Sequence, residues 1–156
     1  MAERLRRLES TFLRHPIYFI TACTHQRQQI LANAVVHSQW IKFAERGAHH
    51  GAWIGDYVLM PDHFHTFVSV DHTRITLSNW IKSLKNSLSA VLRSHQIPSP
   101  HWQKRFFDHV LRTADSYSAK WEYVRENPVR AGLVKDATEW RFSGQIFPVE
   151  FLQPDR

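Results

Sequence analysis

The chain has 156 residues, of which 43% are hydrophobic and 13% aromatic, so it is long enough for one domain with a packed core and is not expected to be disordered. Its net charge of +6 favours polyanionic partners, nucleic acid above all. The single cysteine, Cys23, excludes an internal disulfide and a cysteine-rich zinc framework, and no apolar run approaches the roughly 20 residues of a membrane span.

We expect a basic N-terminal arm over residues 1–13 and one domain over residues 14–156. The arm, which is charged and unlike a signal peptide, either lies along nucleic acid or is simply a charged chain start. These features favour a cytoplasmic protein associated with the nucleoid.

The first half of the domain is predicted to form a strand, a helix and a second strand. Residues 15–24, HPIYFITACT, are β-branched and aromatic and predict a strand. Residues 33–50 have apolar side chains at helical spacing, with Asn33 as a plausible N-cap. Residues 52–60 predict a second strand, in which Gly55 marks a bulge.

A third strand follows within residues 57–70, YVLMPDHFHTFVSV, after a turn at Pro61 and Asp62. Successive side chains of a strand point to opposite faces of the sheet. One face of this strand is ordinary core. The other carries His63, His65, Phe67 and Ser69.

The second half is more helical. Residues 76–95 have the spacing of an amphipathic helix, capped by Thr76 or Ser78. Residues 102–112 are ambiguous, residues 114–127 predict a helix that ends before Pro128, and residues 140–152 form a short strand or an irregular cover.

This order of elements predicts an α+β fold. Strand, helix, two strands and helix form a ferredoxin-like split βαβ arrangement, an antiparallel sheet with helices packed on it. A fourth strand is needed to complete the sheet. Either residues 104–111 or the tail could supply it.

The paired histidines, His63 and His65, have two possible interpretations. Two neutral imidazoles on one rigid strand can bind a divalent cation if a third ligand comes from elsewhere. Alternatively, His63 and His65 are surface or hydrogen-bonded histidines. The apolar neighbours place them in a central strand, where imidazoles without partners are costly to bury.

The segment YVREN offers a nucleophile and a ligand. Tyr123 and Asn127 are four residues apart and share one face of a helix. The amide oxygen of Asn127 could be the third ligand, and a phenolate stabilised by the nearby cation is a nucleophile. The alternative is a tyrosine packed in the core and an asparagine that ends the helix.

Basic residues surround these positions and suit a phosphodiester, although each could equally be a solvated surface charge. They are Arg14, Lys82, Lys85, Lys104, Arg105, Arg112, Arg125 and Arg130. Trp102, Phe106 and Phe107 either stack on bases or lie in the core.

Four segments of the chain together resemble the REP-associated tyrosine transposases of the HUH endonuclease superfamily. They are YFITACTHQRQQIL, YVLMPDHFH, WQKRFFDHVLR and WEYVRENPVRAGLV, and the resemblance covers residues 14–135. Asp62 matches the family's Asn or Asp before the first metal histidine.

The resemblance implies a ferredoxin-like domain with the catalytic tyrosine, Tyr123, on a C-terminal helix. His63 and His65 would bind Mg²⁺ or Mn²⁺, with Asn127 at the place of a polar third ligand. The implied activity is metal-dependent cleavage and rejoining of single-stranded DNA at REP-type hairpins, through a 5′-phosphotyrosine intermediate.

The resemblance implies no nucleotide cofactor. We expect no membrane partner, since the sequence lacks a long apolar run, and we expect a monomer rather than a homodimer. Two other functions fit the residues alone. One is a noncatalytic module that binds single-stranded nucleic acid, and the other is a metal-dependent phosphoesterase that uses water.

Overall fold

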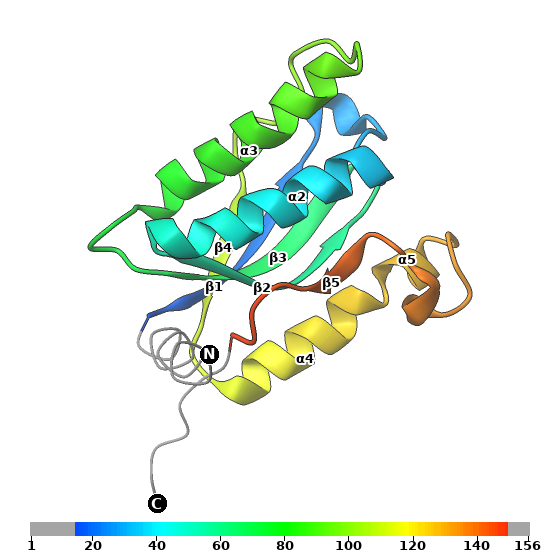
Figure 1. The fold of residues 1–156 in the computed structure, drawn as a ribbon. Helices are drawn as coiled ribbons and strands as arrows, with labels where there is room; N and C mark the ends of the chain where they lie inside the picture. The colour runs from blue at the N-terminus through cyan, green and yellow to red at the C-terminus, as the bar shows by residue number, and fades with distance from the viewer. Residues whose placement is uncertain (1–14, 150–156) are drawn as a thin grey trace, which may run out of the picture.

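The computed structural model describes residues 15–149 (Figure 1). The predicted arm over residues 1–13 and the basic residue Arg14 lie outside this range. Besides the main helices, the described part contains three short 3-10 helices: η1 (His25–Arg27), η2 (Ala48–His50) and η3 (Ala137–Glu139). It contains no helix long and apolar enough to cross a membrane.

The sheet has five strands, in the order β4-β1-β3-β2-β5, and every neighbouring pair is antiparallel. The strands are β1 (Ile17–Cys23), β2 (Ala52–Leu59), β3 (His63–Val70), β4 (Phe107–Leu111) and β5 (Ser143–Gln145). The predicted α+β, split βαβ fold is confirmed. Both candidates for the fourth strand are used, because β4 extends one edge of the sheet and the tail extends the other as β5.

Helices cover both faces of the sheet (Figure 1). On one face lie α2 (Ala34–Gly47) and α3 (Leu77–Ser94), and on the other lies α4 (Ala114–Arg125). The larger core forms under α2 and α3, around Trp40, Phe64 and Trp80. A smaller core forms between the sheet and α4, so the histidine face of β3 is covered in part by a helix.

The predicted cap at Asn33 is confirmed, and Thr76, one of the two predicted candidates, caps α3. The side chains of Asn33, Thr76 and Thr113 each accept a hydrogen bond from a backbone N–H of the first turn of α2, α3 and α4. A cap of this kind contributes about 1 kcal/mol. Ser78, the alternative cap, lies inside α3 instead.

The predicted bulge at Gly55 is confirmed, since the pairing of β2 with β3 shifts register between Ile54 and Tyr57. A Cβ atom at Gly55 would lie 2.9 Å from the hydroxyl oxygen of Tyr117 and 3.2 Å from Cβ of Val149. A side chain at this position would therefore force Tyr117 of α4 or Val149 to move.

The prediction of one helix through Asn127 is wrong at its end. α4 ends at Arg125, and a separate short helix, α5 (Asn127–Arg130), follows with Pro128 in its first turn. Proline lacks the N–H that a first turn leaves unpaired, so it fits there. Tyr123 and Asn127 consequently lie on two consecutive helices. The predicted turn at Gly132 is confirmed by its φ of +73°.

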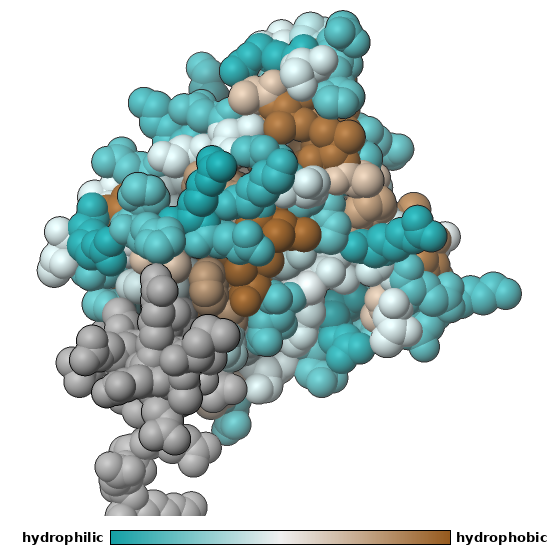
Figure 2. Space-filling view, in the orientation of Figure 1, coloured by the Kyte–Doolittle hydropathy of each residue, from teal (hydrophilic) through white to brown (hydrophobic). Residues whose placement is uncertain are grey.

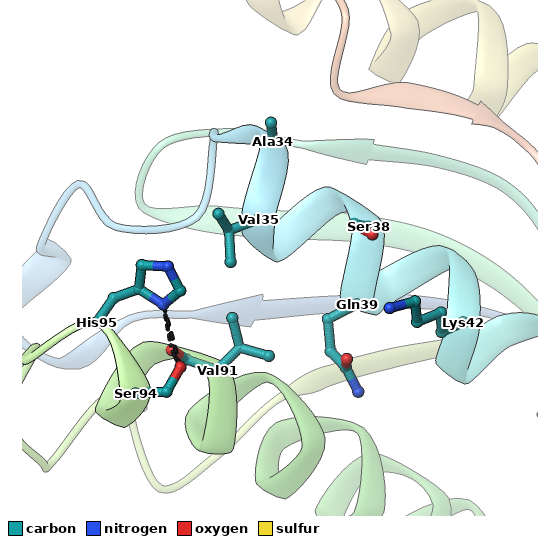
Figure 3. A pocket seen from close by; sticks show the side chains of 8 residues that line it. All are labelled: Ala34, Val35, Ser38, Gln39, Lys42, Val91, Ser94 and His95. Carbon is teal, nitrogen blue, oxygen red and sulfur yellow. Dashed lines mark hydrogen bonds between the residues drawn. The ribbon is translucent and has the colours of Figure 1, made fainter.

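The outer face of α2 and α3 carries a shallow apolar hollow. Figure 2 shows apolar surface where the end of α3 meets the start of α2, and Figure 3 shows Val35 and Val91 pointing toward one another there. Gln39, Lys42 and His95 also line this α2/α3 hollow, and no carboxylate does. It lies on the face of the sheet away from the paired histidines.

We expect Gly55→Ala to lower the free energy of unfolding by about 1–3 kcal/mol, because the added methyl group meets the Tyr117 hydroxyl. Urea unfolding of Gly55→Ala, Tyr117→Phe and the double variant measures the coupling. The cost of Gly55→Ala should be smaller in the Tyr117→Phe background, where that oxygen is gone. An equal cost in both backgrounds would contradict the steric explanation.

Candidate active site

The two histidines of β3 lie side by side on the face that α4 covers. Their ring centroids are 4.9 Å apart, with the planes nearly perpendicular. The ring of His65 also stacks on Phe19 of β1, 5.3 Å away, and Phe19 in turn contacts Phe67. The strand alternation therefore predicts the shared face of these side chains correctly.

Each imidazole is oriented through its Nδ1 atom. Nδ1 of His63 donates to the Asp62 carboxylate over 2.7 Å, and Nδ1 of His65 lies 2.7 Å from the Thr21 hydroxyl. When Nδ1 carries the hydrogen, Nε2 presents a lone pair. A carboxylate or hydroxyl partner on the far nitrogen is the usual support of a metal-binding histidine, so the pair suits a divalent cation.

Burial keeps His65 neutral. Loss of hydration is the main cause that lowers the pKa of His65 to about 3, and the neighbouring His63 and the cations Lys120, Arg130 and Arg27 act in the same direction. The imidazole therefore carries no proton on its second nitrogen at neutral pH. A neutral ring is the form that binds metal.

Asp62 is held from two sides. Arg27 Nε donates to one of its carboxylate oxygens over 2.8 Å, while His63 donates to the other. Burial alone would raise the pKa of Asp62, but these two hydrogen bonds and charges hold it below its ordinary value. Arg27 also donates to the Cys23 sulfur over 2.9 Å, so one guanidinium links η1, β1 and the turn before β3.

The other half of the site comes from α4 and α5. Lys120 Nζ lies 4.9 Å from the ring centre of Phe19, beside His65. Tyr123, one turn later, is 65% exposed, and the Arg130 guanidinium lies 4.0 Å from its ring centre. The charge of Arg130 also acts on His65. A solvent-facing phenol and a set of cations therefore occur on the histidine side of α4.

Asn127 is held by Arg130. The same guanidinium donates to the Asn127 side-chain oxygen and to the backbone oxygen of Tyr123. No group of three or more His, Cys, Asp or Glu side chains that could hold a metal occurs between residues 15 and 149. A cation bound by the two histidines would thus need ligands of another kind, and the amide oxygen of Asn127 is a candidate.

The predicted basic residues divide into three places. Lys82, Lys85 and Lys104 line a groove between α3 and the segment that leads to β4, whose floor includes Trp102 and Phe106. Arg105 and Arg112 are exposed on either side of β4. Arg130 lies on α5 against the ring of Tyr123, and Arg125 lies at the end of α4.

Two of the three aromatic side chains in that segment pack inward. Trp102 and Phe106 contact the larger core, and the Trp102 indole donates to the Ser89 hydroxyl over 3.0 Å. Lys85 Nζ donates to the backbone oxygen of Gln103. Phe107 is 77% exposed, so it does not lie in the core and is free to stack on a base.

Sequence reasoning overlooked Arg27, Lys120 and Thr21. Thr21 has a detectable signal, because strand alternation puts it on the face of Phe19, and β1 pairs with β3 so that Thr21 opposes His65. Lys120 precedes Tyr123 by three residues, which places both on one side of a helix. Arg27 has no such signal, since it lies in an irregular turn with a φ of +54°.

The chain is similar to known transposases. The family model of IS200-like transposases matches residues 14–127. The REP-associated tyrosine transposase of Escherichia coli is 28% identical over 90 residues, which are 58% of this chain and 52% of that protein, so the match spans about half the length of the relative. A Haemophilus influenzae protein named a putative REP-associated tyrosine transposase is 21% identical over 142 residues. The match covers 85% of this chain and 81% of that protein.

A solved structure shares the fold. The structure of a REP-associated tyrosine transposase bound to a REP hairpin superposes with a TM-score of 0.69 at 21% identity, covering 89% of this chain and 86% of the other.

Acid should destabilise the metal-free protein through His65. In the unfolded chain His65 binds a proton below about pH 6.5, whereas in the folded chain it does so only below its lowered pKa of about 3. The free energy of unfolding therefore falls as the pH falls between these two values. The loss is at most about 1.4 kcal/mol per pH unit. Urea unfolding between pH 6 and 4 in the presence of a chelator should show a shallower decline for His65→Gln. Parallel declines would contradict the assigned pKa.

Proposed function

Because the chain belongs to the IS200-like transposase family, we propose that it is a metal-dependent endonuclease and strand transferase that acts on single-stranded DNA beside hairpins. The observation that carries the proposal is the pairing of two oriented imidazoles on β3 with an exposed phenol on the helix that covers the same face of the sheet.

Tyr123 is the proposed nucleophile. Its oxygen bonds to phosphorus as the phenol loses its proton, the bond from phosphorus to the 3′ oxygen breaks, and that oxygen leaves as a hydroxyl after taking up a proton. The product is a 5′-phosphotyrosine, and attack by another 3′-hydroxyl reverses the step and joins strands. Its 65% exposure leaves Tyr123 open to a DNA strand.

His63 and His65 are the proposed metal ligands, and Asn127 is the third. A bound Mg²⁺ or Mn²⁺ would supply positive charge to a non-bridging oxygen of the scissile phosphate. Asp62 and Thr21 hold the imidazoles, and Arg130 holds the Asn127 oxygen beside Tyr123. Arg130 is close enough to this phenol to orient it and to contribute charge to the phosphate.

The remaining basic residues are proposed to bind the DNA backbone. The groove of Lys82, Lys85 and Lys104 offers ammonium groups above an aromatic floor, a combination typical of single-strand binding. Arg105, Arg112 and the exposed Phe107 extend this surface along the sheet edge. The solved protein of the same fold is bound to a REP hairpin. This supports a hairpin substrate for this chain but does not identify its sequence.

Tyr123→Phe should abolish a covalent protein–DNA adduct while leaving DNA affinity within about twofold. A labelled hairpin oligonucleotide is incubated with protein and Mn²⁺, denatured and resolved on a gel. Tyr18→Phe, which removes a phenol on another part of the sheet, is the matched control and should still form the adduct. An adduct formed by Tyr123→Phe would exclude this nucleophile, and cutting without any adduct would point to a hydrolase that uses water.

His63→Ala and His65→Ala should each lower Mn²⁺-dependent cleavage at least about 100-fold, because each removes one proposed ligand. Circular dichroism establishes that each variant is folded, and a Mn²⁺ titration followed by electron paramagnetic resonance measures binding apart from activity. His95→Ala, at the exposed end of α3, is the control and should behave as the wild type. Unchanged Mn²⁺ affinity in both strand variants would refute the ligand assignment.

A further inference from the structure

A second polar hollow, which we call the α4/β5 hollow, lies between α4, η3 and β5. Trp121 and Arg125, one turn apart on α4, line it together with Asp56, Trp140 and Gln145. On α4 the buried Val124 lies between this pair and the side chains of Lys120 and Tyr123. The hollow and the proposed nucleophile therefore occupy two flanks of one helix.

The hollow contains a half-buried carboxylate with spare hydrogen-bonding capacity. Asp56 Oδ2 accepts from the Tyr117 hydroxyl over 2.7 Å and lies 3.5 Å from the Gln145 amide. Asp56 Oδ1 has no hydrogen-bond partner among residues 15–149. Burial raises the pKa of Asp56, although Tyr117, Gln145 and Arg125 oppose the shift. A carboxylate that has lost hydration gains from a ligand that donates N–H groups.

A guanidinium faces the same space. The positive charge of Arg125 acts on Asp56 and on Asp136, yet within the described range Arg125 forms no ion pair at 4.0 Å or less. Its N–H groups thus remain available. Both an acceptor group and a donor group line the hollow. This combination suits a neutral ligand that carries donors and acceptors better than a bare phosphate, because the carboxylate repels an anion.

Two indoles give the hollow apolar surface. Trp121 comes from α4, where its ring contacts Phe67, and Trp140 comes from the segment before β5. The Trp140 indole donates to the backbone oxygen of Leu59 over 3.0 Å, which holds the ring in place. Indole faces are the common platform on which an unpaired base stacks.

We propose that the α4/β5 hollow binds one unpaired guanine base of the DNA strand. Guanine presents two adjacent donors, N1–H and the 2-amino group, to the Asp56 carboxylate, and two acceptors, O6 and N7, to an arginine. Adenine and cytosine offer one amino donor on that edge, and thymine offers one imide N–H. The inference rests on the proposed function, since the base would belong to the strand that Tyr123 attacks.

The test measures base preference in the absence of chemistry. Tyr123→Phe protein is titrated with a fluorescent twelve-residue thymidine oligonucleotide that carries at its centre guanine, inosine, which lacks the 2-amino group, or adenine. We expect guanine to bind about 5- to 150-fold more tightly than inosine or adenine. Asp56→Asn in the same background should reduce the preference below twofold, because an amide cannot accept from both donors. Lys42→Ala, in the α2/α3 hollow of Figure 3, should leave the preference intact.

Equal affinity for the three oligonucleotides, or an undiminished guanine preference in Asp56→Asn, would overturn the proposal. If Asp56→Asn does not fold, Arg125→Gln decides, since it should also abolish the preference. The covalent-adduct assay separates this inference from the proposed function. An adduct without guanine preference refutes the base site alone, whereas guanine preference without any adduct leaves a base-binding site on a protein that is not a tyrosine nuclease.

Discussion

The packing of α4 on the histidine face of the sheet is the contact on which the rest of the site depends. Phe67 of β3 lies 4.1 Å from the Tyr117 ring, centre to centre, and Val124 is buried beside it. Gly55 permits this approach, because any side chain there would meet the Tyr117 hydroxyl. One apolar contact therefore sets the helix that carries Tyr123 against the strand that carries His63 and His65.

One face of the sheet contributes most of the apolar core, and the other face carries the polar groups of the candidate site. Under α2 and α3 the core is large and almost wholly apolar, which suits a scaffold. On the α4 side the core is smaller and leaves room for polar groups on both flanks of the helix. One flank carries the two histidines, Lys120 and Arg130. The opposite flank carries Asp56 and Arg125. Arg130 connects the pieces of the first flank, because it contacts Tyr123, Asn127 and, through its charge, His65.

Much of this arrangement could be predicted from local sequence patterns. Alternation along residues 63–70 places the imidazoles on one face, and capping residues locate the starts of α2 and α3. The edge strands could not be assigned, since Phe107–Leu111 is mostly exposed and β5 has only 3 residues, so neither has a clear apolar period. The sequence does not predict a second helix after α4, because proline usually ends a helix, although it is tolerated in a first helical turn. Arg27 and Asp56 acquire their roles only through contacts between distant segments, as with the 61-residue separation of Asp56 from Tyr117.

The most direct measurement of the central claim is the anomalous diffraction of Mn²⁺ in crystals of Tyr123→Phe protein bound to a hairpin oligonucleotide. We expect one strong peak within coordination distance, about 2.0–2.3 Å, of Nε2 of both His63 and His65. A DNA phosphate oxygen should bind the metal, and the ring of residue 123 should face that phosphorus. A manganese peak away from both histidines, or a scissile phosphate remote from them with residue 123 turned away, would contradict this claim.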